Sequence, residues 1–148
     1  MLKCWGIVTG GLNTDTAVRR SVELLDPTNN KQCQLPDLPN ERYRHTQVLG
    51  AKEKISLSFL NKTFHIQNGN ILCGGYPTIE TKKTCIRFED GQWIVSNHLI
   101  HPRYEHRSWT NKYGQVLLIG GWEGKQSTEK LTSDGRSQES FNLEYGSV

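Results

Sequence analysis

The sequence is poor in several features that mark helical, membrane or nucleic-acid-binding proteins. It has one methionine among 148 residues, and no apolar run approaches the ~20 residues that a membrane-spanning helix requires. The net charge of +3 is too small to indicate binding to nucleic acid or to an anionic membrane. We therefore expect no nucleic acid and no membrane among the partners.

Cysteine is scarce and irregularly spaced. Its four cysteines, Cys4, Cys33, Cys73 and Cys85, form no CxxC pair. Cys73 lies in an apolar run and is predicted to be a small core residue, with all cysteines reduced. The opening stretch MLKCWGIVTGG has no apolar segment before a small-residue cleavage site, so no signal peptide is predicted. These observations favour a cytoplasmic localisation.

The chain is rich in glycine and in aromatic residues. Its 14 glycines, four tryptophans, five tyrosines and four phenylalanines are typical of a folded, turn-rich β protein rather than of a disordered chain. The glycines are also ordered along the sequence. An apolar segment ending in a glycine pair occurs three times, as GIVTGGLNT (6–14), NILCGGYPT (70–78) and VLLIGGWEG (116–124).

Other segments repeat in register with the glycine pairs. A second strand-like segment follows each pair and ends at a turn signal, Asp26-Pro27, Asp90-Gly91 or Asp134-Gly135. Two further segments, RYRH (42–45) and RYEH (103–106), match each other and are called the RYxH segments below. Asn68-Gly69 is a hairpin signal directly before the second apolar segment.

On these residues the sequence resembles the kelch-repeat proteins. The spacing from Gly75 to Gly121 is close to the kelch period of ~50 residues, and the Gly-His…Trp-Asp signature of WD40 repeats is absent. The resemblance implies an all-β fold with negligible helix, in which each repeat forms one four-stranded antiparallel blade of a β-propeller. The alternative is a sandwich of unrelated β-hairpins.

The repeats divide the chain into about three blades. Residues 1–41 form a blade lacking its first strand, residues 42–101 a blade with an insert at 48–62, and residues 102–146 a third blade. Closed propellers need about four to eight blades, so we expect a partial propeller in an open arc. Its end blades are expected to leave an apolar face and a strand edge bare, which predicts self-association.

The insert at 48–62 leaves three interpretations open. Ile55, Leu57 and Phe59 alternate with serines, as in a strand, which favours an extra hairpin or bulged loop. A long loop can also be a binding loop. The third interpretation is a segment that does not belong in the mature chain.

The glycine pairs are expected to let backbones approach closely and turn sharply. The aromatic residue that follows two of the pairs, Tyr76 or Trp122, is expected to fill the wedge between neighbouring blades.

The resemblance implies that ligands are met by loops on one face of the disk. The predicted ligand-binding residues are Asn13, Thr14, Asp15, Tyr76, Thr78, Glu80, Trp122, Glu123, Lys125, Arg42 and Arg103. Because Arg42 and Arg103 repeat in register with His45 and His106, the alternative for these two is that they hold the blades together.

No catalytic site is predicted. The chain shows no nucleophile with its base and no paired acid and base. His98-x-x-His101 is the one metal-like spacing, and strand alternation would put its two imidazoles on opposite faces. We therefore predict a non-enzymatic protein-binding module of an adaptor or scaffold, with no cofactor and no metal. The alternative is a fragment of a galactose-oxidase-like or carbohydrate-binding kelch propeller, whose copper site has no matching set of residues here.

Overall fold

The structure, a computed structural model, is built almost entirely of antiparallel β-sheet. It describes residues 6–26, 28–49, 54–59, 62–67, 70–111, 113, 115–131 and 137–142. The predicted turns at Asp26-Pro27, Asn68-Gly69 and Asp134-Gly135 fall wholly or partly outside these residues, as does Cys4. Within the described ranges, no helix is long and apolar enough to cross a membrane.

The first sheet contains three strands in the order β1-β2-β3. They are β1 (Gly6–Thr9), β2 (Val22–Asp26) and β3 (Lys31–Leu35). Burial alternates along β2, because Val22, Leu24 and Asp26 face the rest of the molecule and the residues between them face outward. β1 pairs only with β2, so its other edge carries no strand of the described chain.

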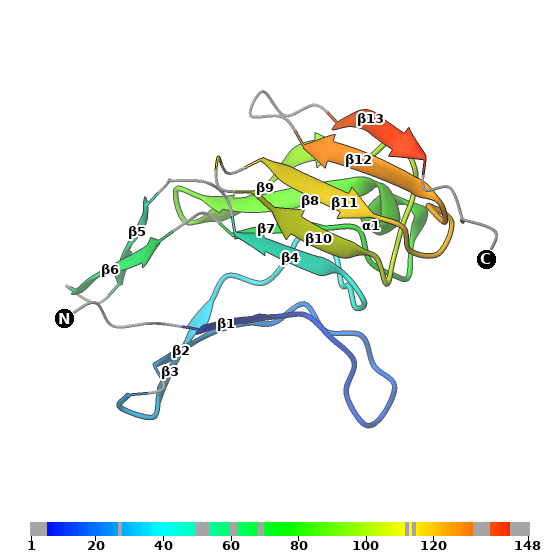
Figure 1. Ribbon diagram of the computed structural model, residues 1–148. Helices are drawn as coiled ribbons and strands as arrows, with labels where there is room; N and C mark the ends of the chain where they lie inside the picture. Colours follow the sequence, from blue (N-terminus) through cyan, green and yellow to red (C-terminus); the bar gives the residue numbers. More distant parts are fainter. Residues whose placement is uncertain are drawn as a thin grey trace.

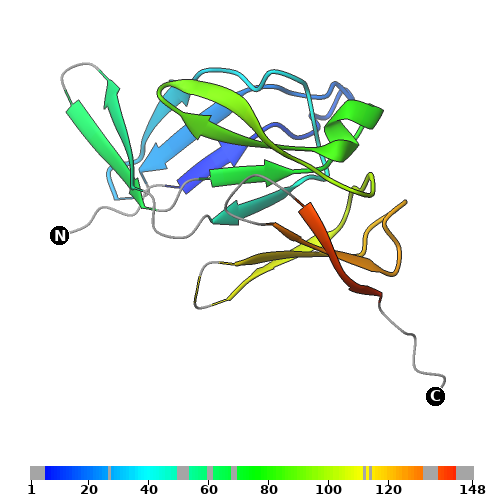
Figure 2. The ribbon, with the colours of Figure 1, turned by 90° about the horizontal axis from the view of Figure 1, so that it is seen from above.

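The second sheet lies between the first and the third (Figures 1 and 2). Its strand order is β4-β7-β8-β9. The strands are β4 (Thr46–Leu49), β7 (Asn70–Cys73), β8 (Thr84–Glu89) and β9 (Gln92–His98). Because it has a neighbour on each side, both faces of β8 are buried at its start, where Thr84, Cys85 and Ile86 are all inaccessible.

Two short elements interrupt this sheet. A hairpin of β5 (Lys54–Phe59) and β6 (Lys62–Gln67) projects beside the second sheet and joins no other strand of the described chain (Figure 1). The hairpin therefore extends past the predicted insert at 48–62, because the second run of alternating residues pairs with the first. The one helix of the described chain is α1 (Ile79–Lys83), capped by Thr78, whose side chain accepts a hydrogen bond from the Thr81 amide.

The third sheet has four strands in the order β10-β11-β12-β13. They are β10 (Arg107–Thr110), β11 (Val116–Ile119), β12 (Ser127–Leu131) and β13 (Ser137–Asn142). The all-β fold with negligible helix is thus confirmed. Each glycine pair directly follows a strand, which is β1 in the first sheet, β7 in the second and β11 in the third.

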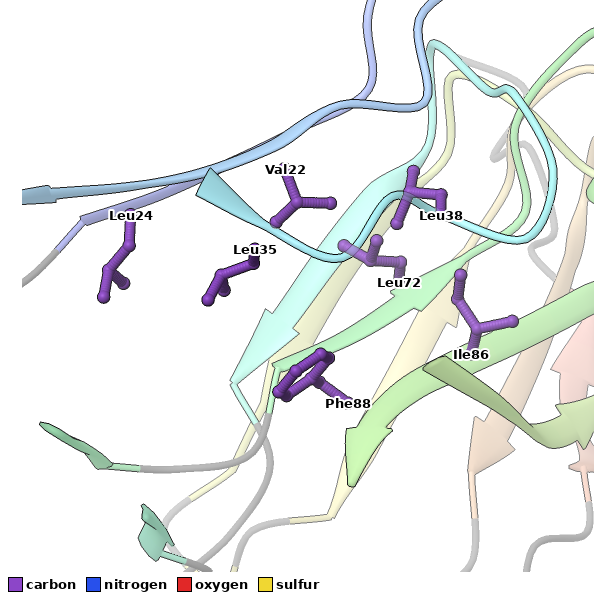
Figure 3. Packing of buried hydrophobic residues seen from close by; sticks show 7 residues of the cluster. All are labelled: Val22, Leu24, Leu35, Leu38, Leu72, Ile86 and Phe88. Atoms are coloured by element: carbon purple, nitrogen blue, oxygen red, sulfur yellow. The ribbon is translucent and has the colours of Figure 1, made fainter. Parts of the chain in front are cut away.

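Two hydrophobic cores join the three sheets face to face. Between the first and second sheets, seven buried residues point toward one another (Figure 3): Val22, Leu24, Leu35, Leu38, Leu72, Ile86 and Phe88. Between the second and third sheets the buried residues are Cys73, Cys85, Leu99, Val116, Leu118 and Leu131. Leu72 and Cys73, neighbours in β7, belong to different cores because successive side chains leave opposite faces of a strand.

The outward faces of the two end sheets carry polar and apolar side chains. On the first sheet, Glu23 is paired across the strands with Gln34 on one side and with Val8, which is 50% exposed, on the other. On the third sheet, Trp109 pairs with Leu117 and is 57% exposed. Each of the two outward faces thus exposes an apolar side chain, Val8 on the first sheet and Trp109 on the third, and self-association remains a prediction.

The prediction that all cysteines are reduced is wrong for two of them. Cys73 is fully buried, as predicted, but it forms a disulfide with Cys85 on the neighbouring strand. The two cysteines are direct partners in the β7–β8 register, which brings together residues 12 positions apart in the sequence. Cys33 is free and exposed.

We expect loss of this disulfide to destabilise the fold. Replacing Cys85 by alanine should lower the free energy of unfolding by roughly 2–3 kcal/mol, because the cross-link restricts the unfolded chain and fills the core between two sheets. Denaturant unfolding measures the change, and Cys33→Ala is the control that should leave the midpoint in place. An unchanged midpoint after reduction of the wild-type protein would contradict the prediction.

Candidate functional site

The glycine pairs and the RYxH segments pack directly against one another. A Cβ atom added at Gly74 would lie 2.4 Å from the carbonyl oxygen of Arg103 and 2.8 Å from the His106 ring. One added at Gly10 would lie 2.4 Å from the carbonyl oxygen of Arg42. The first glycine of a pair is therefore required where the RYxH segment of the next sheet crosses it.

The second glycine of a pair meets the RYxH segment of its own sheet. A Cβ atom at Gly75 would lie 3.0 Å from the Tyr43 carbonyl oxygen, and one at Gly121 would lie 2.6 Å from that of Tyr104. All of these glycines have positive φ angles, which also favour glycine. The expectation that the glycines allow close backbone approach is met, and the group that approaches is the RYxH backbone.

The expectation that Trp122 and Tyr76 fill the wedge between blades is wrong. Trp122 is 58% exposed and Tyr76 is 36% exposed. Their backbones bridge the RYxH tyrosines of their own sheets, Trp122 with Tyr104 and Tyr76 with Tyr43. Such a bridge at the end of a sheet turns the ring toward solvent, while Leu118, Leu72 and their neighbours fill the space between sheets.

We expect Gly74→Ala to destabilise the fold through this inter-sheet contact. Gly120 is the matched control, because its φ of 64° is close to the 62° of Gly74 while its Cβ would approach only the Lys125 carbonyl oxygen, at 3.0 Å. Gly120→Ala should cost about 1 kcal/mol for the positive φ, and Gly74→Ala roughly 2–3 kcal/mol because the clash is added. Equal losses in thermal or denaturant unfolding would show that the contact does not matter.

The RYxH arginines are interior residues. Arg42 and Arg103 are both 0% exposed, so neither contributes surface to a ligand-binding face. Arg103 is held by four acceptors in its own sheet: the Gly120 and Ser127 carbonyl oxygens, the Ser127 hydroxyl and the Glu129 carboxylate. Arg42 donates one bond, of 3.3 Å, to the Gly74 carbonyl oxygen.

The two arginines differ because their sheets supply different acceptors. Ile86 of the second sheet occupies the position that Glu129 has in the third. The strand partner of Glu129 is Leu118 and that of Ile86 is Leu72, and each partner lies two residues before the two glycines of its sheet. Burial lowers the pKa of Arg42 to about 10, although the charge of Glu80 opposes this shift. Arg42 is therefore a buried cation without a carboxylate bonded to it.

The RYxH histidines are neutral and lie between sheets. Burial lowers the pKa of His45 to about 4, with a contribution from Arg42. Burial likewise lowers the pKa of His106 to about 3, with contributions from Arg103 and His45. His45 Nε2 lies 2.9 Å from the Thr9 hydroxyl of the preceding sheet. Neither ring nitrogen of His106 has a hydrogen-bond partner in the described chain, because the position of Thr9 is taken by Cys73 in the second sheet.

The connections after the three glycine pairs lie at one end of the molecule, on the right in Figure 1. At this end four aromatic rings form a continuous series, called the aromatic row below. Tyr43 and Tyr76 are 5.4 Å apart between ring centroids, Tyr76 and Tyr104 are 5.5 Å apart, and Tyr104 stacks on Trp122 at 6.3 Å. The row runs from the second sheet to the third.

A lysine lies over the middle of the aromatic row. Lys82 Nζ is 5.2 Å from the centre of the Tyr76 ring and 5.4 Å from that of Tyr104. It also forms an ion pair with Glu123 at 2.5 Å. The hydrogen bond to Glu123 raises the pKa of Lys82, so its charge is maintained over the aromatic faces.

The predicted ligand-binding residues have different environments. Tyr76, Trp122 and Glu123 are brought together through the aromatic row and Lys82. Thr14, Asp15, Glu80 and Lys125 are exposed, whereas the Asn13 side chain accepts a bond from the Ala17 amide within its own loop. The Thr78 side chain caps α1.

Sequence reasoning missed Tyr43, Tyr104 and Lys82 as members of this site. The two tyrosines were visible in the matched RYRH and RYEH segments, so their register with Tyr76 and Trp122 could have indicated them. Lys82 gave no signal, because it reaches the rings only through the placement of α1, to which it belongs. Among the residues that the structure covers, no three His, Cys, Asp or Glu side chains are grouped to hold a metal ion.

The fold is that of a kelch-type β-propeller, represented here by part of the ring. One similar solved structure is a fungal alcohol oxidase of the AA5 family in complex with copper. It is 12% identical with a TM-score of 0.60, and the match covers 88% of this chain and 26% of that one. Another is YjhT, 15% identical with a TM-score of 0.63, where the match covers 93% of this chain and 42% of that one.

The chain therefore spans less than half the length of either solved structure. No protein-family model matches the sequence, and no curated protein matches it significantly. At these identities the likeness defines the fold alone, and the activity of the oxidase does not transfer to this chain.

Proposed function

We propose that this chain is a protein-binding kelch module, part of a larger adaptor or scaffold, and that it is not an enzyme. The observation that carries the proposal is the aromatic row with Lys82 above it. Tyrosine and tryptophan dominate the binding energy of protein interfaces, because they bury large areas at a small entropic cost. Here they come from two sheets, so the row presents a preformed surface rather than one mobile loop.

The charges beside the row favour a partner with its own polar contacts. Lys82 and Glu123 form an ion pair at the surface, with Glu123 partly exposed. Arg44 pairs with Glu105 nearby at 3.0 Å, which joins the two RYxH segments. Such pairs at the rim of an aromatic patch contribute orientation and specificity more than affinity. The partner we propose is a protein that places an apolar side chain against Tyr76 and Trp122.

The test compares two tryptophans of equal exposure. Trp122 and Trp109 are 58% and 57% exposed, but only Trp122 belongs to the aromatic row. Once a partner has been isolated by crosslinking in cells, Trp122→Ala should weaken its affinity for the purified chain about 10-fold or more. Trp109→Ala should leave the affinity within about 2-fold, and both variants should keep the wild-type unfolding temperature.

Two outcomes would contradict the proposal. Equal weakening by both substitutions would separate partner binding from the aromatic row. Stoichiometric copper in the purified protein, together with oxidation of an alcohol or sugar, would instead favour the galactose-oxidase-like alternative, and saturable binding of an oligosaccharide at the row would favour the carbohydrate-binding one.

A further inference from the structure

Lys82 is held in place by its backbone and by two rings of the aromatic row. Its amide donates to the Thr78 carbonyl oxygen at 3.0 Å, within α1, and its carbonyl oxygen accepts a bond from the Arg103 amide at 3.0 Å. The residue is therefore tied both to its helix and to the RYxH segment of the third sheet. Its ammonium group lies over the rings of Tyr76 and Tyr104, and its side chain is only 15% exposed.

Glu123 is the less constrained member of the ion pair with Lys82. Its side chain is 39% exposed, and it bonds Lys82 through one oxygen, Oε1. Its backbone has a φ of 63°, a left-handed conformation that a residue other than glycine adopts at an energetic cost. Residues in such conformations gather at binding and active sites. Of the two members of the pair, Glu123 is therefore the one that a competing group replaces more easily.

A second ion pair repeats this arrangement. Arg44 lies over the Tyr43 ring, 5.4 Å from its centre, and its Nε pairs with Glu105 Oε1. The Arg44 and Glu105 side chains are 51% and 40% exposed, and Glu105 also has a positive φ, of 55°. In both pairs the cation belongs to the second repeat and the carboxylate to the third. Two cations thus lie over neighbouring rings of the row, each with an exposed carboxylate as its present partner.

A cation fixed over aromatic rings suits an acidic side chain of a partner. A carboxylate forms a charge-assisted bond with an ammonium or guanidinium group, while its apolar stem packs on the rings. The pair that it would break is weak, because an ion pair in contact with water contributes little net stability. Exchange of one carboxylate for another also leaves the Lys82 charge compensated throughout.

We propose that the aromatic row binds an acidic segment of the partner, in which one carboxylate takes the place of Glu123 on Lys82. Arg44 accepts a second acidic group of the same segment in place of Glu105. This inference rests on the proposed function, and it adds the chemistry of the partner and the role of Glu123 as an internal competitor. The site lies between the second and third sheets.

The experiment uses an acidic peptide and its uncharged counterpart. The peptide Gly-Glu-Leu-Glu-Leu-Gly, or the same peptide with glutamine in place of glutamate, is titrated into the full chain and the NMR chemical shifts of the chain are followed. We expect Lys82→Met to weaken the acidic peptide about 5-fold or more, because the charge-assisted bond is lost. Glu123→Gln should strengthen its binding about 3-fold, because the competitor is removed while Lys82 stays in place. The glutamine peptide should bind both of these variants and the wild type equally weakly.

Matched variants in α1 separate the site from general charge attraction. Lys83→Met removes the same charge from the exposed neighbour of Lys82, and Glu80→Gln removes an exposed carboxylate from the same helix. Each should change the affinity for the acidic peptide by less than about 2-fold, because long-range attraction between exposed charges is screened by salt. Equal effects of the two lysine substitutions, or of the two glutamate substitutions, would overturn the proposal.

The outcome is distinguishable from that of the test of the proposed function. If Trp122→Ala weakens an isolated partner while Glu123→Gln does not strengthen the acidic peptide, the row binds proteins without this exchange and the present inference is wrong. Tighter binding of a lysine peptide to the Lys82→Met chain would show instead that the rings and Glu123 receive a cation. Should Lys82→Met fail to fold, the sign of the Glu123→Gln effect decides. No saturable binding to a folded wild-type chain would also overturn the proposal.

Discussion

Replacing Glu129 by alanine is expected to lower the free energy of unfolding by roughly 3–5 kcal/mol. The carboxylate has no exposed surface and accepts bonds from the Arg103 guanidinium and from the Ile100 and His101 amides. Its removal leaves the buried Arg103 cation without its carboxylate and two partly buried amide donors without this acceptor. Breaking a buried pair on one side costs more than the pair contributes, because the remaining charge stays out of water.

The RYxH segment at 42–45 supplies the control for this prediction. Arg42 is as buried as Arg103 but has no carboxylate bonded to it. We therefore expect Arg42→Met, which keeps an unbranched apolar stem in place of the arginine stem, to cost much less than Arg103→Met, which leaves Glu129 without its cation. Urea unfolding of the three variants makes the comparison, and a larger loss for Arg42→Met than for Arg103→Met would contradict it.

Mild acid is expected to destabilise the protein through the two RYxH histidines. Their pKa values in the folded chain, about 4 for His45 and about 3 for His106, lie below the ordinary value of 6.5. The unfolded chain therefore binds protons first as the pH falls, so stability is full above pH ~6.5 and is lost toward pH 4. Each histidine contributes on the order of 2–3 kcal/mol to the loss by pH 4.

Single substitutions test which histidine is responsible. His106→Gln should remove about half of the loss between pH 7 and pH 4, because one titrating group is gone. His98, which is exposed, is the control, and His98→Gln should leave the pH dependence of unfolding unchanged. A wild-type unfolding free energy that stays constant between pH 7 and pH 5 would show that the two histidines are not buried as described.

The repeat pattern was sufficient to predict the fold class. Glycine pairs after apolar runs recur in register, and each marks a place where two backbones approach too closely for a Cβ atom. Such a requirement is local to the glycine, so it is visible in the sequence. The aromatic rings were also visible, but their direction was not, because a ring at the end of a strand can turn inward or outward. The bridge to Tyr104 or Tyr43 decides this for Trp122 and Tyr76.

Pairings across the sheet could not be read in the same way. Cys73 and Cys85 meet because the β7–β8 register aligns them, and no spacing rule relates the two positions. Glu129 binds Arg103 because its strand places the carboxylate on the face toward the second sheet, although the same Ser-x-Glu stretch in the first repeat leaves Glu23 unpaired. Identical letters thus have different partners, because the third sheet has an RYxH arginine beside its carboxylate and the described part of the first sheet has none.

The contact between glycine pairs and RYxH segments also has a direction. Arg42 crosses Gly10 of the sheet before it, and Arg103 crosses Gly74 in the same sense, so neighbouring sheets meet through unlike surfaces. A contact of this heterologous type repeats with the same rotation at each step, and it ends only when the rotation closes a ring; otherwise it continues as a helix. The next step in this series falls at Gly120, where the carbonyl oxygen of Lys125 is the one described atom within 4 Å of the Cβ position. Any further sheet, whichever chain contributes it, is therefore expected to join there through its own RYxH backbone.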